Sequence, residues 1–127
     1  PKDIEQNQCV LVRRDNREKQ FVSLDNLEEA IEGSLTALHD AIYQRALDNL
    51  KEKTFTATTY EEFLDTAQNH PGFIKAMWCG EQACEDEIKD RFGASSRCMP
   101  FDQTPIGETC VCCGKPAKKV IYFAKAY

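Results

Sequence analysis

Two cysteine pairs constrain this chain more than any other feature of its sequence. Cys79 and Cys84 form a C-x4-C pair, and Cys110 and Cys113 form a C-x2-C pair that is followed by Gly114. When two such pairs lie on turns, they can place four thiolates around one ion in the tetrahedral geometry of a structural zinc site. The spacing therefore predicts a fold in which two turns that are distant in sequence meet.

Gly114 indicates which thiol serves as the fourth ligand. A tight turn at this point needs a residue that takes positive φ, where its amide can point at sulfur, and glycine adopts that conformation without steric cost. We therefore assign Cys113 rather than Cys112 as the ligand, and we expect Cys112 to point away. The remaining cysteines, Cys9 and Cys98, fall on predicted strands as small apolar residues.

Other interpretations of the cysteines remain open at this stage. One is a group of buried free thiols. A catalytic zinc would keep an open position and usually a His or carboxylate ligand, but His39 falls within a predicted helix and His70 precedes a proline. A redox-active thiolate would be stabilised where C-x-x-C opens a helix, whereas Cys113 leads into a Gly-Lys-Pro turn.

The number of cysteines does not favour disulfides. The chain has seven cysteines, so pairing all of them in disulfides would leave one thiol over. We expect a closed, structural zinc site.

The first part of the chain is predicted to be a hairpin and a long helix. Residues 8–13 and 20–22 have the pattern of two strands around a turn. An apolar stripe at three- and four-residue steps predicts a helix over about residues 25–52, begun by Asp25 paired with Glu28. The stripe consists of Leu24, Leu27, Ile31, Leu35, Leu38, Ile42 and Ala46. Two strands cannot cover so long an apolar face, so we expect part of its packing partner to be missing.

From residue 54 the pattern predicts the order β-α-β-α-β-β. Strands are predicted over residues 54–58, 73–78, 95–100 and 119–127. One helix follows the capping pair Thr59 and Glu62, and a second runs from residue 81 to residue 92 and is stopped by Gly93. This order is typical of a two-layer α+β sandwich with helices on one face of a sheet. We therefore expect two domains, residues 1–53 and 54–127.

Composition excludes several classes of protein. Apolar residues make up 42% of the chain and charged residues 29%, which is typical of neither a disordered tail nor a membrane protein. No apolar run approaches the roughly 18 residues of a transmembrane helix. The net charge of −5 does not predict nucleic-acid binding. Because the chain begins with Pro1 and not with Met, we expect a fragment or a processed product.

No catalytic apparatus is visible in the sequence. It contains no phosphate-binding glycine loop, no H-E-x-x-H motif and no Ser-His-Asp set with plausible spacing. The acidic residues of the predicted helix over 81–92 are interpreted as a solvated face. We therefore assign no catalytic residue and expect the fragment alone to be inactive.

Several segments of the chain together resemble one family. Residues 1–3 (PKD) and 10–15 (VLVRRD) resemble the end of the anticodon-binding domain of prolyl-tRNA synthetase. Residues 75–80 (KAMWCG), 95–103 (SSRCMPFDQ) and 110–117 (CVCCGKPA), with the closing Ala126 and Tyr127, resemble the zinc-binding C-terminal domain of that family. The resemblance is to the archaeal and eukaryotic type of the enzyme, which some bacteria also have, and it covers almost the whole chain.

The resemblance implies a parent enzyme and a place for this chain within it. Such class II synthetases work as cytoplasmic homodimers that activate proline with ATP and Mg²⁺ and transfer it to proline tRNA. Their signature motifs lie upstream of the anticodon-binding domain, so the fragment is expected to bind neither ATP nor Mg²⁺. Its expected partners are the catalytic and anticodon-binding domains of the same chain. The family's C-terminal domain has a βαβαββ fold similar to the C-terminal half of translation initiation factor three.

The resemblance also implies roles for individual residues. The family's zinc ligands match Cys79, Cys84, Cys110 and Cys113. In some members the carboxylate of the terminal tyrosine reaches toward the active site, and Tyr127 matches it by position. Arg13 and Arg14 lie near the anticodon-binding strand and are candidate tRNA contacts.

A freestanding zinc module is the alternative hypothesis. Such a protein would bind RNA or a protein partner through the basic residues near its end. These are Lys115, Lys118, Lys119 and Lys125. It would predict RNA binding by the isolated chain that falls steeply with added salt.

Overall fold

The structure is a computed structural model that describes residues 2–125. The chain divides into two compact units, Pro1–Asn49 (unit 1) and Leu50–Tyr127 (unit 2). Within the described range, no helix is long and apolar enough to cross a membrane. The mixed α+β class predicted from the sequence is confirmed.

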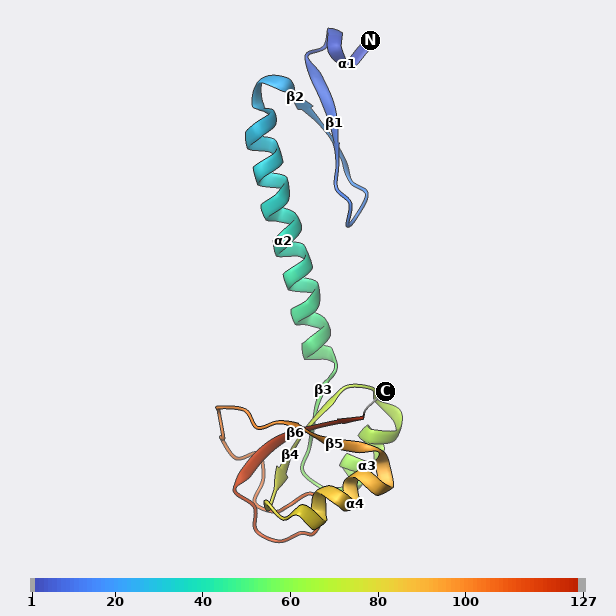
Figure 1. Cartoon of the computed structure of the whole chain (residues 1–127), viewed down its shortest axis with the longest axis vertical. Helices are drawn as coiled ribbons and strands as arrows, with labels where there is room; N and C mark the ends of the chain where they lie inside the picture. Colours follow the sequence, from blue (N-terminus) through green and yellow to red (C-terminus); the bar gives the residue numbers. More distant parts are fainter. Residues whose placement is uncertain (1, 126–127) are drawn as a thin grey trace. The chain divides into compact units, whose positions relative to one another are not determined.

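Unit 1 contains a hairpin and most of a long helix (Figure 1). The short helix α1 (Lys2–Glu5), which the sequence analysis did not predict, precedes strands β1 (Gln8–Val12) and β2 (Lys19–Ser23). The two strands pair antiparallel, with Gln8 opposite Ser23. A 3-10 turn (Leu24–Asn26) leads into helix α2 (Leu27–Glu52). The predicted hairpin and long helix are both confirmed.

The predicted cap of the long helix is wrong. Ser23 is the N-cap of the 3-10 turn that precedes α2, because Ser23 is extended (φ −62°, ψ 139°) and its hydroxyl accepts from the Asp25 N–H. Asp25 itself lies inside the 3-10 turn, where a residue cannot take the extended conformation that an N-cap requires. The N-cap of the first helical turn therefore lies two residues before the predicted one.

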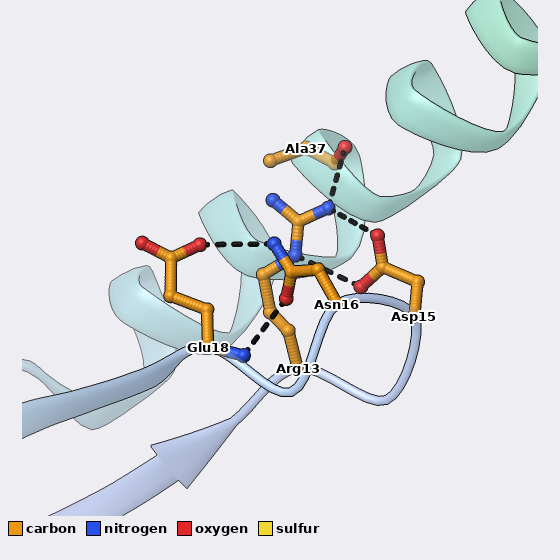
Figure 2. Close-up of polar contacts among 5 residues, drawn as sticks. All are labelled: Arg13, Asp15, Asn16, Glu18 and Ala37. Carbon is orange, nitrogen blue, oxygen red and sulfur yellow. Dashed lines mark hydrogen bonds and ion pairs between the residues drawn. The ribbon is translucent and has the colours of Figure 1, made fainter.

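Arg13 joins the hairpin turn to helix α2 (Figure 2). Its Nε and Nη2 donate to the two carboxylate oxygens of Asp15 at 3.1 Å and 2.7 Å, and Nη2 also donates to the Ala37 carbonyl at 3.4 Å. This pairing raises the pKa of Arg13 and lowers the pKa of Asp15. The turn is closed by Asn16, whose side-chain oxygen accepts from the Glu18 N–H at 2.9 Å.

The apolar stripe of α2 is largely uncovered. Of the described residues of unit 1, Val22 alone is buried. Leu35 is 59% exposed and Ile42 is 51% exposed, although both lie on the stripe. Most of the apolar stripe of α2 is therefore not buried by the described residues of this chain.

Unit 2 has the predicted β-α-β-α-β-β order. Its elements are β3 (Thr54–Ala57), α3 (Tyr60–Asn69), β4 (Phe73–Trp78), α4 (Gln82–Phe92), β5 (Ala94–Cys98) and β6 (Lys119–Lys125). The strand order in the sheet is β3-β4-β6-β5. Strands β3 and β4 are parallel, and β6 runs antiparallel to both β4 and β5. Consequently β3, β4 and β5 begin at the same end of the sheet where β6 finishes.

The core of unit 2 lies between its helices and one face of the sheet. Ile74 pairs with Phe123 and Ala76 with Ile121 across β4 and β6, so all four side chains share a face. Both helices pack on that face, because Phe63 of α3 and Ile88 of α4 belong to the same buried cluster. The rings of Phe63 and Phe123 meet edge to face, with centroids 5.4 Å apart. The two-layer arrangement is confirmed.

The helix caps of unit 2 were predicted correctly. Thr59 and Glu62 form a capping box at the start of α3, and Gly93 follows the last residue of α4 with its N–H on the Lys89 carbonyl. The Glu62 carboxylate accepts from the N–H and hydroxyl of Thr58 and from the N–H of Thr59. These bonds, that from the Thr58 N–H first, lower the pKa of Glu62.

The segment between β5 and β6, residues 99–118, contains no helix or strand. Gln103 fastens it to the sheet, because its side chain accepts from the Val120 N–H at 2.8 Å and donates to the Val120 carbonyl at 3.1 Å. A second tie is the Val111 N–H, which donates to the Met77 carbonyl at 3.0 Å. Loops of this length without regular structure are uncommon in compact domains, so other restraints are expected.

Candidate metal centre

Four cysteine sulfurs converge in unit 2. The Sγ atoms of Cys79, Cys84, Cys110 and Cys113 all lie within 4.8 Å of one another. Cys79 is 3.6 Å from Cys84 and 3.9 Å from Cys113, measured between Sγ atoms. A tetrahedral zinc with bonds of about 2.3 Å to sulfur has sulfur–sulfur edges of about 3.8 Å. The arrangement therefore fits one tetrahedrally bound ion.

The first pair is positioned by the junction of β4 and α4. Cys79 directly follows Trp78, the last residue of β4, and Cys84 lies in the first turn of α4. The Cys84 N–H donates to the carbonyl of Glu81, the N-cap residue, at 3.2 Å. Strand and helix thus bring two thiols together across only four intervening residues.

The second pair is positioned by a tight turn. The Cys110 N–H donates to the Lys115 carbonyl at 2.7 Å, and the Gly114 N–H donates to the Cys110 carbonyl at 2.9 Å. Gly114 has a φ of +68°, the left-handed conformation that the sequence predicted. The prediction that its amide can point at sulfur is wrong, because that amide closes the turn on the Cys110 carbonyl.

The backbone amides distinguish Cys110 from the other thiols. Burial raises the pKa of Cys110, but the N–H groups of Cys113, Cys112 and Cys79 outweigh burial and lower the pKa to about 7. Burial raises the pKa of Cys79 and of Cys84, which lack such a set of amides. A metal ion needs thiolates, so binding would displace protons and would weaken in acid.

The other cysteines lie outside the group of four. Cys112 is half-buried and packs against two buried clusters of unit 2. One is the cluster that contains Phe63 and Ile88, and the other consists of Met77, Cys84, Cys110, Ala117 and Val120. Burial raises the pKa of Cys112. Cys9 is on β1 and Cys98 ends β5, where its side chain is exposed. Neither histidine joins the group. His39 is exposed on α2, and His70 caps α3 with its ring 5.2 Å from that of Phe55.

The remaining predicted site residues lie elsewhere in the chain. Arg13 is half-buried and engaged by Asp15, whereas Arg14 beside it is exposed. Tyr127 lies outside the described residues. The acidic residues of α4 that were interpreted as a solvated face, Asp86, Glu87 and Asp90, are exposed.

Sequence reasoning missed a contact between two side chains beside the cysteines. The aromatic ring of Trp78, next to Cys79, has the Lys119 Nζ 5.4 Å from its centroid. This pair forms because Trp78 and Lys119 are opposite each other across β4 and β6. Strand register, which no local pattern reveals, creates the contact.

The chain matches known proteins along its whole length. The family model described as "Prolyl-tRNA synthetase, C-terminal" matches residues 60–127. All 127 residues align with proline–tRNA ligases of Clostridium botulinum type A at 57% identity and Lachnoclostridium phytofermentans at 57%, and with proline–tRNA ligase 2 of Bacillus cereus at 54%. The chain spans about 27% of the length of each of these relatives.

Proposed function

This chain belongs to the prolyl-tRNA synthetase family as a C-terminal region, and on that premise we propose that it is part of an enzyme that ligates proline to its tRNA. The observation that carries the proposal is the match of the entire chain at 54–57% identity to ligases several times its length. The activity of the parent would then use ATP and Mg²⁺, bound by domains upstream of this region. The parent would act in the cytoplasm as a homodimer, because that is where and how enzymes of this kind charge tRNA.

For the cysteine cluster we propose a structural zinc site with Cys79, Cys84, Cys110 and Cys113 as ligands. Four protein sulfurs leave no open coordination position, which separates structural from catalytic zinc. The spacing of the sulfurs suits a single ion, and tetrahedral thiolate sites select zinc or iron. The resemblance of the motifs to the family's zinc-binding domain favours zinc.

The proposed role of this zinc is to fix the 99–118 segment. That segment has no regular structure, and two of the four ligands, Cys110 and Cys113, lie in it. The other two lie at the junction of β4 and α4. The ion would therefore crosslink an irregular segment to the regular part of unit 2, as a support for the catalytic core of the parent.

Unit 1 is proposed to be the end of the anticodon-binding domain. Among its described residues this unit buries Val22 alone, so it has little hydrophobic core of its own, and the apolar stripe of α2 is exposed. Upstream residues of the parent would cover this face. Within this unit the exposed Arg14 is the better candidate for a tRNA contact, since the guanidinium of Arg13 is held by Asp15. For Tyr127 we propose the role that its position implies, with its carboxylate directed toward the active site.

A matched pair of cysteine variants tests the zinc site. We expect Cys113→Ser to lower both the zinc bound per chain, measured by elemental analysis, and the melting temperature, because metal binding and folding free energy are coupled. Cys112→Ser, one residue away, should change neither by much. Equal zinc loss from both variants would contradict the ligand assignment.

The parent activity is tested separately in the full-length ligase. We expect that protein to charge tRNA with proline in the presence of ATP and Mg²⁺, and the 127-residue chain alone to charge none. A full-length protein that retains its zinc but attaches no proline to tRNA would contradict the ligase proposal and leave the zinc site standing.

A further inference from the structure

A pocket of about 560 Å³ opens at the end of the unit 2 sheet that is remote from the cysteines. Phe73, the first residue of β4, lines the pocket, whereas Cys79 follows the last residue of the same strand. The starts of β4 and β5 and the end of β6 meet there. All lining residues belong to unit 2. The pocket is therefore formed by this end of the sheet together with the end of α3 and the loop that follows it, away from the metal centre.

The charges around this pocket are of one sign. Lys53, Arg97 and Lys125 line it together with His70, and among the described residues its lining contains no Asp or Glu. Within residues 2–125, none of these three cations takes part in an ion pair. The Oδ2 of Asp65 lies 4.0 Å from the His70 Nε2. Positive charges gathered in one pocket repel one another, and an anion bound among them would relieve that repulsion.

A bulge in β5 directs the arginine to this end of the sheet. Ser96 pairs with Phe123 and Cys98 with Tyr122, so Arg97 is the extra residue between two consecutive partners. Bulges of this kind redirect a side chain and recur beside binding sites. The Arg97 Nη2 donates to the Ala124 carbonyl at 3.3 Å, which holds the guanidinium next to the end of β6. Its other donors remain available to a ligand.

The floor and wall of the pocket are apolar and closely packed. Ala67, Ile74 and Ala94 line the floor. Phe73 also lines the pocket and is 37% exposed, and its ring meets that of Tyr122 edge to face with centroids 6.4 Å apart. Gly72 is required beside it, because a Cβ at Gly72 would clash with the Lys53 carbonyl oxygen. The Phe73 N–H donates to that same oxygen at 2.8 Å.

From these observations we propose that the pocket binds the phosphate group of a nucleotide. Arginine and lysine recognise phosphate through charge-assisted hydrogen bonds, and a guanidinium does so with paired donors. The apolar residues Ala67, Ile74 and Ala94 and the partly exposed Phe73 give the base an apolar surface to contact, since nucleotide bases pack on apolar and aromatic side chains. The volume falls within the range of pockets for small molecules. This function goes beyond the structural role proposed for the chain and needs neither the zinc nor ligase activity.

The test is a titration of the isotope-labelled, zinc-loaded 127-residue chain with AMP, followed by NMR. The amides of Phe73, Ala94 and Arg97 should shift with saturation. Arg97→Gln should weaken AMP binding by about tenfold or more, as expected for loss of a charge-assisted hydrogen bond. Lys118→Gln removes the same charge from an exposed residue outside the pocket, and it should leave affinity within about twofold.

Further ligands separate the phosphate from the base. Inorganic phosphate should bind at the same amides more weakly than AMP, and adenosine should bind more weakly still. A trinucleotide RNA that binds more tightly than AMP would assign the site to RNA, and the reverse order would assign it to a free nucleotide. If Arg97→Gln does not fold, as judged by its thermal melt, Lys53→Gln takes its place.

Three results would overturn the proposal. One is the absence of shifts at the pocket amides at saturating AMP. Another is equal weakening by Arg97→Gln and Lys118→Gln, which would mean general attraction to a charged surface. The third is adenosine binding as tight as AMP binding, which would remove the phosphate from the recognition.

Discussion

The two units of this chain are built from equally clear local signals but differ in how they are completed. Unit 2 buries a continuous core that includes Phe63, Ile88 and Phe123. Unit 1 buries Val22 alone among its described residues, although its helix is the longest element of the chain. Local hydrogen bonds and spacing therefore specify a helix without supplying anything for it to pack against.

The difference also appears in what each unit needs from outside. In unit 2 the irregular 99–118 segment meets the sheet through Gln103 and through two of the four clustered cysteines. The proposed zinc ion would complete unit 2 by binding these cysteines. In unit 1 the exposed residues are large and apolar, among them Ile31, Leu35 and Ile42. In the proposed parent enzyme, upstream residues would cover these side chains.

Removal of the metal should produce the largest difference in stability between the two units. Zinc binding contributes on the order of 10 kcal/mol in small zinc domains, which is comparable to the whole stability of a typical domain. We expect a strong zinc chelator to unfold unit 2 and to leave the hydrogen bonds of α2 in unit 1 unchanged. The single tryptophan, Trp78, lies beside Cys79 and reports unit 2 by its fluorescence, and amide exchange reports α2.

Adding zinc back should restore the fluorescence. An unchanged melting temperature of unit 2, in a sample shown by elemental analysis to be free of metal, would remove the structural role of the ion. It would also remove the main contrast between the units.

Core truncation should distinguish the units by a smaller amount. Phe63→Ala deletes a fully buried ring and should cost about 3–5 kcal/mol. Leu35→Ala deletes a side chain that is 59% exposed, and in this chain it should change stability by about 0.5 kcal/mol or less. Urea unfolding, followed by Trp78 fluorescence for the first variant and by helical circular dichroism for the second, measures both.

The same Leu35→Ala change tests whether the apolar stripe of α2 is covered in the full-length ligase. If upstream residues cover the stripe there, the cost should rise to about 2–5 kcal/mol. A cost that stays near zero in the full-length protein would mean that the stripe of α2 remains exposed in the parent.

Apart from the loss of metal that acid also favours, acid should produce the smallest difference between the units, and it should appear at the helix starts. The pKa of Glu62 is lowered in the folded chain, so its contribution to stability is present above its unfolded value of about 4.5 and is lost as pH falls through the lower folded value. The 3-10 turn that leads into α2 is N-capped by the hydroxyl of Ser23, which does not titrate. The protection of the amides at the start of α3, corrected for the intrinsic pH dependence of exchange, should therefore fall in acid more than protection at the start of α2.

A neighbouring glutamate provides the control for this effect. Glu62→Gln should flatten the acid dependence at α3, whereas Glu61→Gln, an exposed residue of the same first turn, should leave it intact. The same acid dependence in all three proteins would show that the capping carboxylate is not its source.

Most of the fold could be predicted because its signals are local. The capping box of Thr59 and Glu62 acts within four residues, and the alternation of β4 reflects the two-residue period of a strand. The cap of α2 was misplaced for a related reason, since Ser23 and Asp25 are both good capping residues and only the backbone conformation distinguishes them. The direction of the Gly114 amide was also misjudged, because it depends on how the turn closes.

Apart from α1, the helices and strands and the four cysteines with the spacing of a metal site could be recognised from the amino-acid sequence, because hydrogen bonds three or four residues apart and short turns depend on neighbouring residues. No local pattern predicts that Lys119 lies over Trp78, that Arg97 occupies a bulge beside the end of β6, or that Lys53 and Lys125 meet it at one pocket. These contacts join residues from different strands. They follow from the order and register of the sheet, which are fixed by packing across the whole unit.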